Sequence, residues 1–389
     1  MDPFDKLPEE IHEDLLKYFD VNELFDVMSL VSTSWYKIIA SSTVCMAKLR
    51  LNLKSMRTND FSDRIKTLGW MSRAGGRGYQ DLQINCLLDE SISNEVWKFL
   101  PSMADSAEAL NIRSMKLDKP LSEIFLPKLQ QLQLMFIPRE AMDFLLKSSS
   151  NFRVLIIRNE FSLCYDGIDY NPSVGTIATI KEVVTRNDKL VELELQARPN
   201  FLSFFRVDLT KFVTFKLEKF TVKIEMAPDQ VLPANEANLI KFLIHQAGTL
   251  KHVYVDKCGP NVIQQVFNKM PELNFIRFEI EQREGSKVDM KELSLTPNEK
   301  ITQLELPYIP VFDDLKEFLE LAPNVEELLI GHLVPHFLEF AARNLMKLKT
   351  VVYRYDDSFG GGEAFYRNLR FAEPEANQQI EFSLCNDFL

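Results

Sequence analysis

The sequence predicts an α/β protein in which a short helical module is followed by a long repeat solenoid with a parallel concave sheet. Three observations support this fold class. The first residues follow amphipathic helical patterns, a short apolar pattern then recurs along the chain, and helical stretches separate many of its copies. We place the domain boundary after residue 45, with residues 1–45 as the helical module and residues 46–389 as the solenoid.

The bulk composition indicates a folded protein and argues against a general nucleic-acid binder. The chain has 389 residues, of which 46% are hydrophobic and 26% are charged. These values fit a globular protein and argue against a mostly disordered chain. The formal net charge of −11 disfavours a nucleic-acid partner, because attraction to phosphates requires a basic surface.

The cysteines and the lack of long apolar runs predict the compartment. The cysteines are scattered and form no Cys-x-x-Cys pair, which favours buried thiols in a reducing compartment over a disulfide framework or a zinc site. The first residues are acidic and show no secretory signal. No run approaches the roughly 20 apolar residues that span a bilayer. We therefore expect a cytoplasmic and/or nuclear protein with no membrane partner.

The helical module begins with the stretch "KLPEEIHEDLLKYF". Pro8 suits the first turn of a helix, where its missing N–H is not needed. Ile11, Leu15, Tyr18 and Phe19 recur at helical spacing and form one apolar stripe. A helix this short is marginal alone, because most helical stability comes from packing. Its apolar stripe must therefore contact either the rest of the chain or a second protein.

A second helix is predicted from Asn22, a residue that can cap it. Its apolar positions are Phe25, Met28, Val31 and Trp35. The residues Ser32–Ser34 are also a place where a third short helix could begin. Two or three short helices bury too little surface for robust independent stability, so this module needs a neighbouring domain or a partner.

The stretches "LPEEIHEDLLKYF" and "LVSTSWYKI" together resemble an F-box. The resemblance implies docking on a Skp-type adaptor and, through it, on a cullin-RING ubiquitin ligase. The implied adaptor-binding residues are Leu7, Pro8, Glu10, Ile11, Leu15, Phe19, Val31 and Trp35; Tyr18 and Ile39 also match the family's pattern. Two departures stand out. The turn around Asp20–Glu23 holds one more residue than the pattern, and Thr33 and Ser34 replace the basic pair usual before the tryptophan.

A second class of function stays open. The chain can be a non-catalytic leucine-rich-repeat protein-binding scaffold whose N-terminal helices only cap the solenoid. In that case Leu7, Ile11 and Trp35 share one internal core. In the ligase-adaptor case, the same apolar stripe remains available to a foreign subunit.

The remainder of the chain repeats the pattern apolar-x-x-apolar-x-apolar, in copies such as "YQDLQI", "LQQLQL" and "ITQLEL". The second apolar positions are Leu49, Leu82, Leu110, Leu132, Leu155, Leu193, Val253, Ile276, Leu304, Leu328 and Val351, with a less clear copy near Phe220. Helices are expected at Glu140–Lys147, Thr176–Thr185, Glu236–Gln246, Val262–Lys269, Asp313–Leu321 and His336–Leu345. Most steps are close to the roughly 20–29 residues of a leucine-rich repeat, which the pattern resembles in degenerate form.

Strand alternation identifies candidate substrate-binding residues. Successive side chains of a strand point to opposite faces, so polar residues between the buried leucines face outward. These residues are Gln131, Gln133, Glu192, Glu194, Gln303 and Glu305, and the F-box resemblance implies an as yet unidentified protein substrate for them. A cluster that includes Phe201, Phe204, Phe205, Phe212, Phe215 and Phe220 is expected to form a buried aromatic spine, with an exposed partner patch as the alternative.

The sequence offers no constellation of residues for catalysis, so we expect a non-enzymatic protein without metal or cofactor. Pro335 lies between His332 and His336 and disfavours the helix that would pair them as metal ligands. The glycine run Gly360–Gly362 precedes a predicted helix but lacks the lysine of a phosphate-binding loop. It is better explained as a loop between terminal repeats.

Overall fold

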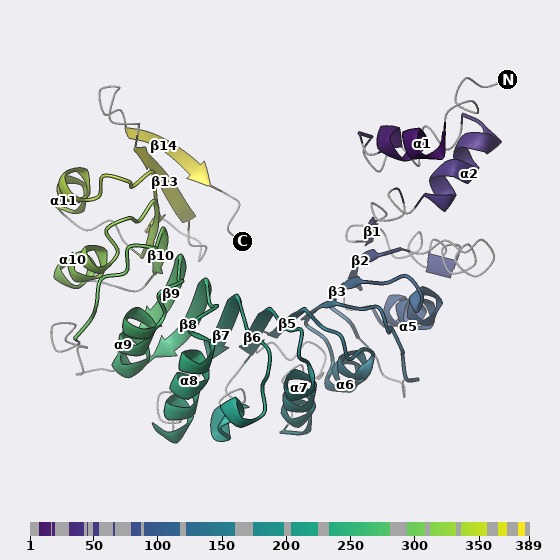
Figure 1. Cartoon of the computed structure of the whole chain (residues 1–389), viewed down its shortest axis with the longest axis horizontal. Coiled ribbons are helices and arrows are strands. Elements are labelled where there is room, and N and C mark those ends of the chain that lie inside the picture. The colour runs from purple at the N-terminus through teal and green to yellow at the C-terminus, as the bar shows by residue number, and fades with distance from the viewer. Residues whose placement is uncertain are drawn as a thin grey trace. The chain divides into compact units, whose positions relative to one another are not determined.

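A computed structural model of the chain shows helices and parallel strands alternating through most of its length (Figure 1). The structure describes residues 8–16, 18–19, 31–42, 45, 50–53, 65–66, 79–86, 89–116, 122–159, 174–197, 204–224, 233–280, 294–307, 312–331, 336–355, 365–371 and 380–385. The chain forms two compact units, unit 1 (Met1–Leu190) and unit 2 (Val191–Leu389).

The N-terminal module of unit 1 contains helices α1 (Glu9–Leu16) and α2 (Thr33–Ser41). Ser32 caps α2, because its hydroxyl oxygen accepts a hydrogen bond from the backbone N–H of Trp35 at 3.2 Å. Trp35 therefore belongs to a helix that starts after Ser32, as the third predicted helix would. Val31 precedes that helix in a turn, and the segment between α1 and Val31 lies outside the described residues.

A small core holds the module together. Leu16, Ile39 and Cys45 are buried, and Phe19, Trp35 and Ile38 pack against them. The core thus joins both helices, and α1 contributes to it through its last residue, Leu16. This arrangement leaves the opposite side of α1 free of that core.

The strands of unit 1 pair in parallel, each with the next along the chain. They are β1 (Arg50–Leu53), β2 (Asp81–Asn85), β3 (Ala109–Arg113), β4 (Gln131–Met135) and β5 (Val154–Asn159). The intervening helices are α5 (Glu90–Phe99), the short 3-10 helix η4 (Leu100–Met103), α6 (Arg139–Lys147) and α7 (Val174–Arg186). Helices α5, α6 and α7 lie on one side of these strands (Figure 1).

Strand residues of unit 1 alternate between a buried and a more open face. Leu110 and Ile112 of β3 are buried, whereas Ala109, Asn111 and Arg113 between and beside them are only half-buried. The strands β2 and β4 repeat this alternation. Leucines and isoleucines thus form the core beneath the helices, and we call the opposite side of the sheet the open face.

Unit 2 continues the same repeat. Its parallel strands are β6 (Glu192–Ala197), β7 (Lys219–Ile224), β8 (His252–Cys258), β9 (Phe275–Ile280), β10 (Gln303–Leu306), β11 (Glu327–Ile330) and β12 (Thr350–Tyr355). Its helices are η7 (Leu209–Lys211), α8 (Pro233–Gln246), α9 (Pro260–Lys269), α10 (Phe312–Leu321) and α11 (Phe337–Asn344). Two further strands, β13 (Phe365–Phe371) and β14 (Ile380–Cys385), are antiparallel.

The predicted α/β fold with a repeated strand-and-helix unit is confirmed, and each predicted repeat helix overlaps an observed one. The copy near Phe220 is a full strand, β7. The classification of the units as leucine-rich repeats and the domain boundary after residue 45 stay predictions.

Two details were wrong. The first strand pairs Leu51, not Leu49, with Leu82, a shift of two residues along the apolar alternation. The residues that follow the glycine run form strand β13 where a helix was predicted. Gly360–Gly362 themselves lie outside the described residues.

The aromatic cluster of unit 2 is largely internal. Phe204, Phe205, Phe215 and Phe220 are buried. They meet Phe242 of α8, whose ring centroid lies 5.4 Å from that of Phe220 and 5.9 Å from that of Phe205. The predicted aromatic spine is thus confirmed for these residues. Phe212 is an exception at 54% exposed, and Phe201 lies outside the described residues.

Candidate functional site

The N-terminal module exposes an apolar surface. Ile11 is 44% exposed, Leu15 37% and Val31 64%. Tyr18 and Tyr36 are exposed as well. We call these five residues the apolar surface of the module. Ile11 and Leu15 are four residues apart and therefore lie on the same face of α1, and an exposed apolar patch typically marks a site of protein interaction.

The geometry of α1 explains how one short helix is both buried and exposed. Residues four apart lie on the same helix face. His12 and Leu16 share the buried face, at 7% and 0% exposed. Ile11 and Leu15 are each turned away from that face by about 100°, which is one residue of helical rotation. The helix therefore packs on its own module with one side and presents aliphatic side chains on another.

The structure divides the adaptor-binding residues predicted from the sequence into two groups. Pro8, Ile11, Leu15 and Val31 are exposed. Pro8 also starts α1, because its carbonyl oxygen accepts hydrogen bonds from the N–H groups of Ile11 at 3.0 Å and His12 at 3.2 Å.

The second group is internal. Phe19 and Trp35 are partly buried against the core around Leu16. Phe19 and Trp35 therefore stabilise the fold of the module. Glu10 lies in the first turn of α1, and Leu7 is outside the described residues. Tyr18 and Tyr36 complete the apolar surface; Tyr18 was placed on the stripe by its spacing, whereas Tyr36 was not considered.

The predicted substrate-binding residues lie on strands of two different units. The expectation that all of them face outward is wrong for Glu194, which neighbouring side chains leave only 2% exposed. In unit 1, Gln133 Oε1 accepts a hydrogen bond from Asn111 Nδ2 at 2.9 Å, and Gln131 is exposed at the start of the same strand. In unit 2, the remaining four residues occupy β6 and β10. Each group is therefore a separate candidate surface.

Charged residues of the open face of unit 2 are paired with one another. Lys219 Nζ lies 2.7 Å from Glu192 Oε1. Arg277 NH1 lies 3.0 Å from Glu305 Oε2, and its guanidinium carbon is 4.5 Å from the centre of the Tyr254 ring. These two ion pairs neutralise Lys219, Glu192, Arg277 and Glu305 within the surface.

Glu194 and Gln303 continue this pairing. Gln196 Nε2 donates to Glu194 Oε1 at 2.6 Å, and Gln303 Nε2 donates to Glu327. Beside them, partial burial and the neighbouring Lys219 lower the pKa of His252, so this imidazole is neutral near pH 7. Each of the four predicted residues of unit 2 thus already has a polar partner within the chain.

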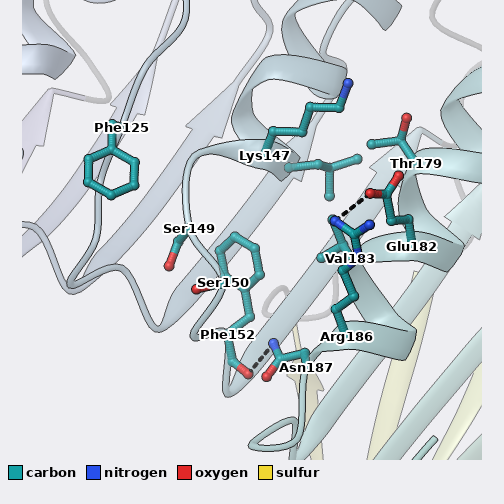
Figure 2. A pocket seen from close by; sticks show the side chains of 11 residues that line it. Phe125, Lys147, Ser149, Ser150, Phe152, Thr179, Glu182, Val183, Arg186 and Asn187 are labelled. Carbon is teal, nitrogen blue, oxygen red and sulfur yellow. Dashed lines mark hydrogen bonds and ion pairs between the residues drawn. The ribbon is translucent and has the colours of Figure 1, made fainter. Parts of the chain in front are cut away.

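A cavity of about 310 Å³ opens on the helix side of unit 1, between the end of α6 and α7 (Figure 2). Several of its polar groups have partners within unit 1. Arg186 NH1 lies 2.6 Å from Glu182 Oε1, Asn187 Nδ2 donates to the carbonyl oxygen of Phe152 at 2.6 Å, and Ser149 Oγ donates to the carbonyl oxygen of Leu129 at 2.8 Å. These bonds connect residues of the chain to one another, so these polar groups serve the fold and are not available to a polar ligand.

In the described part of the chain, the metal-binding and nucleophilic residue types show no sign of a reactive site. Among the residues described, no group of three or more His, Cys, Asp or Glu side chains is arranged to hold a metal ion. Burial raises the pKa of Cys86 to about 12, so its thiol stays protonated and is a poor nucleophile. His332 lies outside the described residues, and His336 directly precedes α11. Within the ranges described, no helix combines the length and apolar character needed to cross a membrane.

Comparison with known families identifies the N-terminal module. The family model of the F-box domain matches residues 4–45, and no curated protein matches the chain in sequence. The chain therefore carries an F-box at its N-terminus, the domain found in substrate receptors of SCF-type ubiquitin ligases. F-box domains bind Skp-type adaptors in cullin-RING ligases, and F-box proteins are in general non-catalytic adaptors.

Proposed function

We propose that this chain is the substrate-recognition subunit of an SCF-type ubiquitin ligase. Its F-box would bind a Skp-type adaptor through the apolar surface of the module, and its repeats would bind a protein substrate. The observation that carries the proposal is the exposure of Ile11, Leu15 and Val31 within a segment that matches the F-box family. Buried thiols at Cys45 and Cys86 fit a cytoplasmic and/or nuclear location.

The apolar surface has the properties of an interface core. Complete burial of an aliphatic side chain stabilises by about 1.5–3 kcal/mol relative to exposure. Ile11, Leu15 and Val31 are exposed in the chain itself. Much of this burial free energy is therefore still available when a partner covers them. A few central apolar anchors commonly provide most of the energy of a protein interface.

The mechanism would require no catalytic residue in this chain. A receptor that holds its substrate near a ubiquitin-conjugating enzyme converts a bimolecular encounter into an effectively intramolecular one. The gain is in effective concentration, which depends on the reach and rigidity of the connecting parts. A stack of strand-and-helix repeats is suited to this task, because each unit packs on the next.

The decisive experiment compares adaptor binding by two matched variants. Ile11→Ser combined with Leu15→Ser removes the exposed aliphatic anchors while leaving the core at Leu16 intact. Ile244→Ser is the control, since Ile244 of α8 is similarly exposed at 42%. Each full-length variant is co-expressed with a Skp-type adaptor and analysed by size-exclusion chromatography.

We expect the double variant to lose co-elution, with affinity reduced at least about a hundredfold if each anchor contributes about 1.4 kcal/mol or more. The control should bind as the original chain does, and circular dichroism should show all proteins folded. Undiminished co-elution of the double variant would show that Ile11 and Leu15 are not the adaptor-binding anchors. Failure of the original chain to co-elute would instead favour the scaffold hypothesis, in which the N-terminal helices only cap the repeats.

A further inference from the structure

Three exposed apolar side chains lie on the helix side of unit 2. Val207, Phe212 and Ile244 are between 42% and 54% exposed. Val207 and Phe212 lie on either side of the short helix η7, and Ile244 belongs to α8. Helix α8 lies on the same side of the strands as α9 (Figure 1).

Two contacts place the segment around η7 along α8. Lys241 Nζ of α8 lies 3.7 Å from Asp208 Oδ2, directly before η7. Lys216 Nζ donates to the carbonyl oxygen of His245 at 2.9 Å, in the last turn of α8. Ile244 lies between these two points along the helix and shares a face with Lys241, since the two are three residues apart. The three apolar side chains therefore belong to one surface.

Cations surround these apolar side chains. The exposed cations of this surface are Arg206, Lys211, Lys216 and Lys241. A hydrogen bond from Thr210 is the main cause of the lowered pKa of Asp208, and the nearby Lys241 and Lys211 lower it further. Both lysines therefore lie close to this carboxylate. We call the three apolar residues and the four cations the basic patch of unit 2.

The charge of the basic patch is only partly compensated by the chain itself. In the part of the chain that the structure describes, no carboxylate forms an ion pair with Arg206, Lys211 or Lys216, although the whole chain carries a net charge of −11. By contrast, three exposed lysines elsewhere in unit 2 each lie 2.7–2.9 Å from a glutamate oxygen; these are Lys251, Lys300 and Lys349. The basic patch thus combines exposed apolar surface with excess positive charge.

We propose that the basic patch binds a segment of a partner protein in which apolar residues and carboxylates lie side by side. Phe212 and Ile244 cover the apolar residues of the segment, and Arg206 and Lys211 pair with its carboxylates. Such complementary charges orient a partner and accelerate its encounter with the surface. This interaction goes beyond adaptor binding and does not require the F-box.

A protein segment suits the basic patch better than a lipid surface or a nucleic acid. Interfacial membrane anchors bury their apolar face about 5–10 Å deep, whereas each apolar side chain of the patch is already about half covered by its own chain. Lys216 and Lys241 are held by His245 and Asp208, which favours a partner with carboxylates at fixed positions. A nucleic acid backbone would leave the apolar side chains without a contact.

The test measures peptide binding by the full-length chain. The probes are three fluorescein-labelled, N-acetylated and C-amidated dodecapeptide libraries built on Ser and Gly. The first contains apolar residues (Leu, Val, Phe) beside acidic residues (Asp, Glu), the second has Asn and Gln in place of the acidic residues, and the third has Ser in place of the apolar ones.

Fluorescence anisotropy should show that the first library binds at least about tenfold more tightly than either of the others. The advantage of the first library over the second should shrink as the salt concentration rises from about 0.1 M to about 1 M, because salt screens exposed charges. The advantage over the third library should persist, since it depends on apolar contact.

Matched variants locate the binding site. Lys211→Glu combined with Phe212→Ser should weaken the first library at least about tenfold. Met346→Ser combined with Lys347→Glu is the control, because these neighbouring residues of unit 2 are also exposed, and it should leave binding unchanged. Ile244→Ser should weaken the first library as well, since α8 forms part of the surface. Circular dichroism shows whether each variant is folded.

Several results would overturn the proposal. These are equal affinity for the first library and either of the others, no binding of the first library at millimolar concentration, or equal effects of the two double variants. Arg206→Gln tests the charge contribution if the patch double variant fails to fold. Binding of phosphatidylserine vesicles or of a DNA oligonucleotide that the patch double variant loses, without peptide binding, would assign the surface to those ligands instead. Adaptor binding through Ile11 and Leu15 is measured separately, so either proposal can fail without the other.

Discussion

Asn187 and Phe152 join two successive repeats of unit 1 by a buried hydrogen bond, in which Asn187 Nδ2 donates to the Phe152 carbonyl oxygen at 2.6 Å. The same device recurs in unit 2, where Asn298 Nδ2 donates to the Met270 carbonyl oxygen at 3.0 Å. In both places a side-chain amide binds a backbone carbonyl of the preceding repeat. A buried asparagine thus ties one repeat to the repeat before it in each unit.

Replacing Asn187 with alanine should destabilise unit 1. The change leaves the Phe152 carbonyl without its donor, and Lys189 N–H loses the Asn187 Oδ1 acceptor at 3.2 Å. We expect the free energy of unfolding to fall by about 1–3 kcal/mol, measured by urea denaturation. Asn261→Ala, at an exposed position of α9, serves as control and should change stability by no more than about 0.5 kcal/mol. Equal stability of both variants would show that the bond contributes little.

Phe242 should be the most sensitive position of the aromatic cluster in unit 2. Its ring lies within 5.4–6.5 Å, centroid to centroid, of Phe205, Phe215 and Phe220. Phe242→Ala should lower the free energy of unfolding by about 3–5 kcal/mol, because it leaves a cavity at the centre of the cluster. Phe212→Ala is the matched control, since this ring is largely exposed. Comparable losses in the two variants would contradict a buried aromatic spine.

Asp143 of α6 should make stability depend on pH. Burial raises the pKa of this carboxyl, outweighing the opposing effects of a hydrogen bond from Thr176 and of nearby Lys147. A raised pKa means that the folded state holds the proton more tightly than the unfolded state. The stabilisation is therefore fully present below the unfolded pKa and is lost as pH rises through the folded pKa.

Asp143→Asn removes this titration while keeping the shape of the side chain. The variant should unfold at a higher temperature than the original chain at pH 7, and the difference should shrink as the pH falls below the unfolded pKa. Thermal melts across this range provide the measurement. A difference that stays constant with pH would mean that the carboxylate at position 143 is not responsible.

Ser32 should control how well α2 is formed. Ser32→Ala removes the acceptor for the Trp35 N–H and should cost about 1 kcal/mol. Amide hydrogen exchange in α2 should accelerate accordingly, and adaptor binding should weaken because Trp35 is held less firmly on the module core. Ser32→Asp, which restores a capping oxygen, should reverse both effects. Failure of the aspartate variant to do so would exclude capping as the cause.

Much of the repeat architecture follows from the sequence because buried strands require regular apolar positions. Leu82, Leu110 and Leu132 were placed on one register, and they do pair across β2, β3 and β4. The first strand was misplaced by two residues because "MAKLRLNL" offers alternating apolar residues over its whole second half. A shift of two preserves the buried face, so alternation alone cannot choose between Leu49 and Leu51.

The site was predictable only in outline. The spacing of Ile11 and Leu15 indicated an apolar stripe, but His12 and Leu16 have the same spacing and form the buried side. Which side receives a partner depends on where α2 packs, and that contact is not local in sequence.

The direction of β13 limits how the array can grow. After β12 the chain turns back, and β13 pairs with it in antiparallel register, from Thr350 opposite Arg370 to Tyr355 opposite Phe365. A further parallel unit would have to occupy the hydrogen-bonding edge that β13 already fills. Further strand-and-helix repeats can therefore be added only upstream of residue 350. The antiparallel strand β13 ends the parallel array at β12.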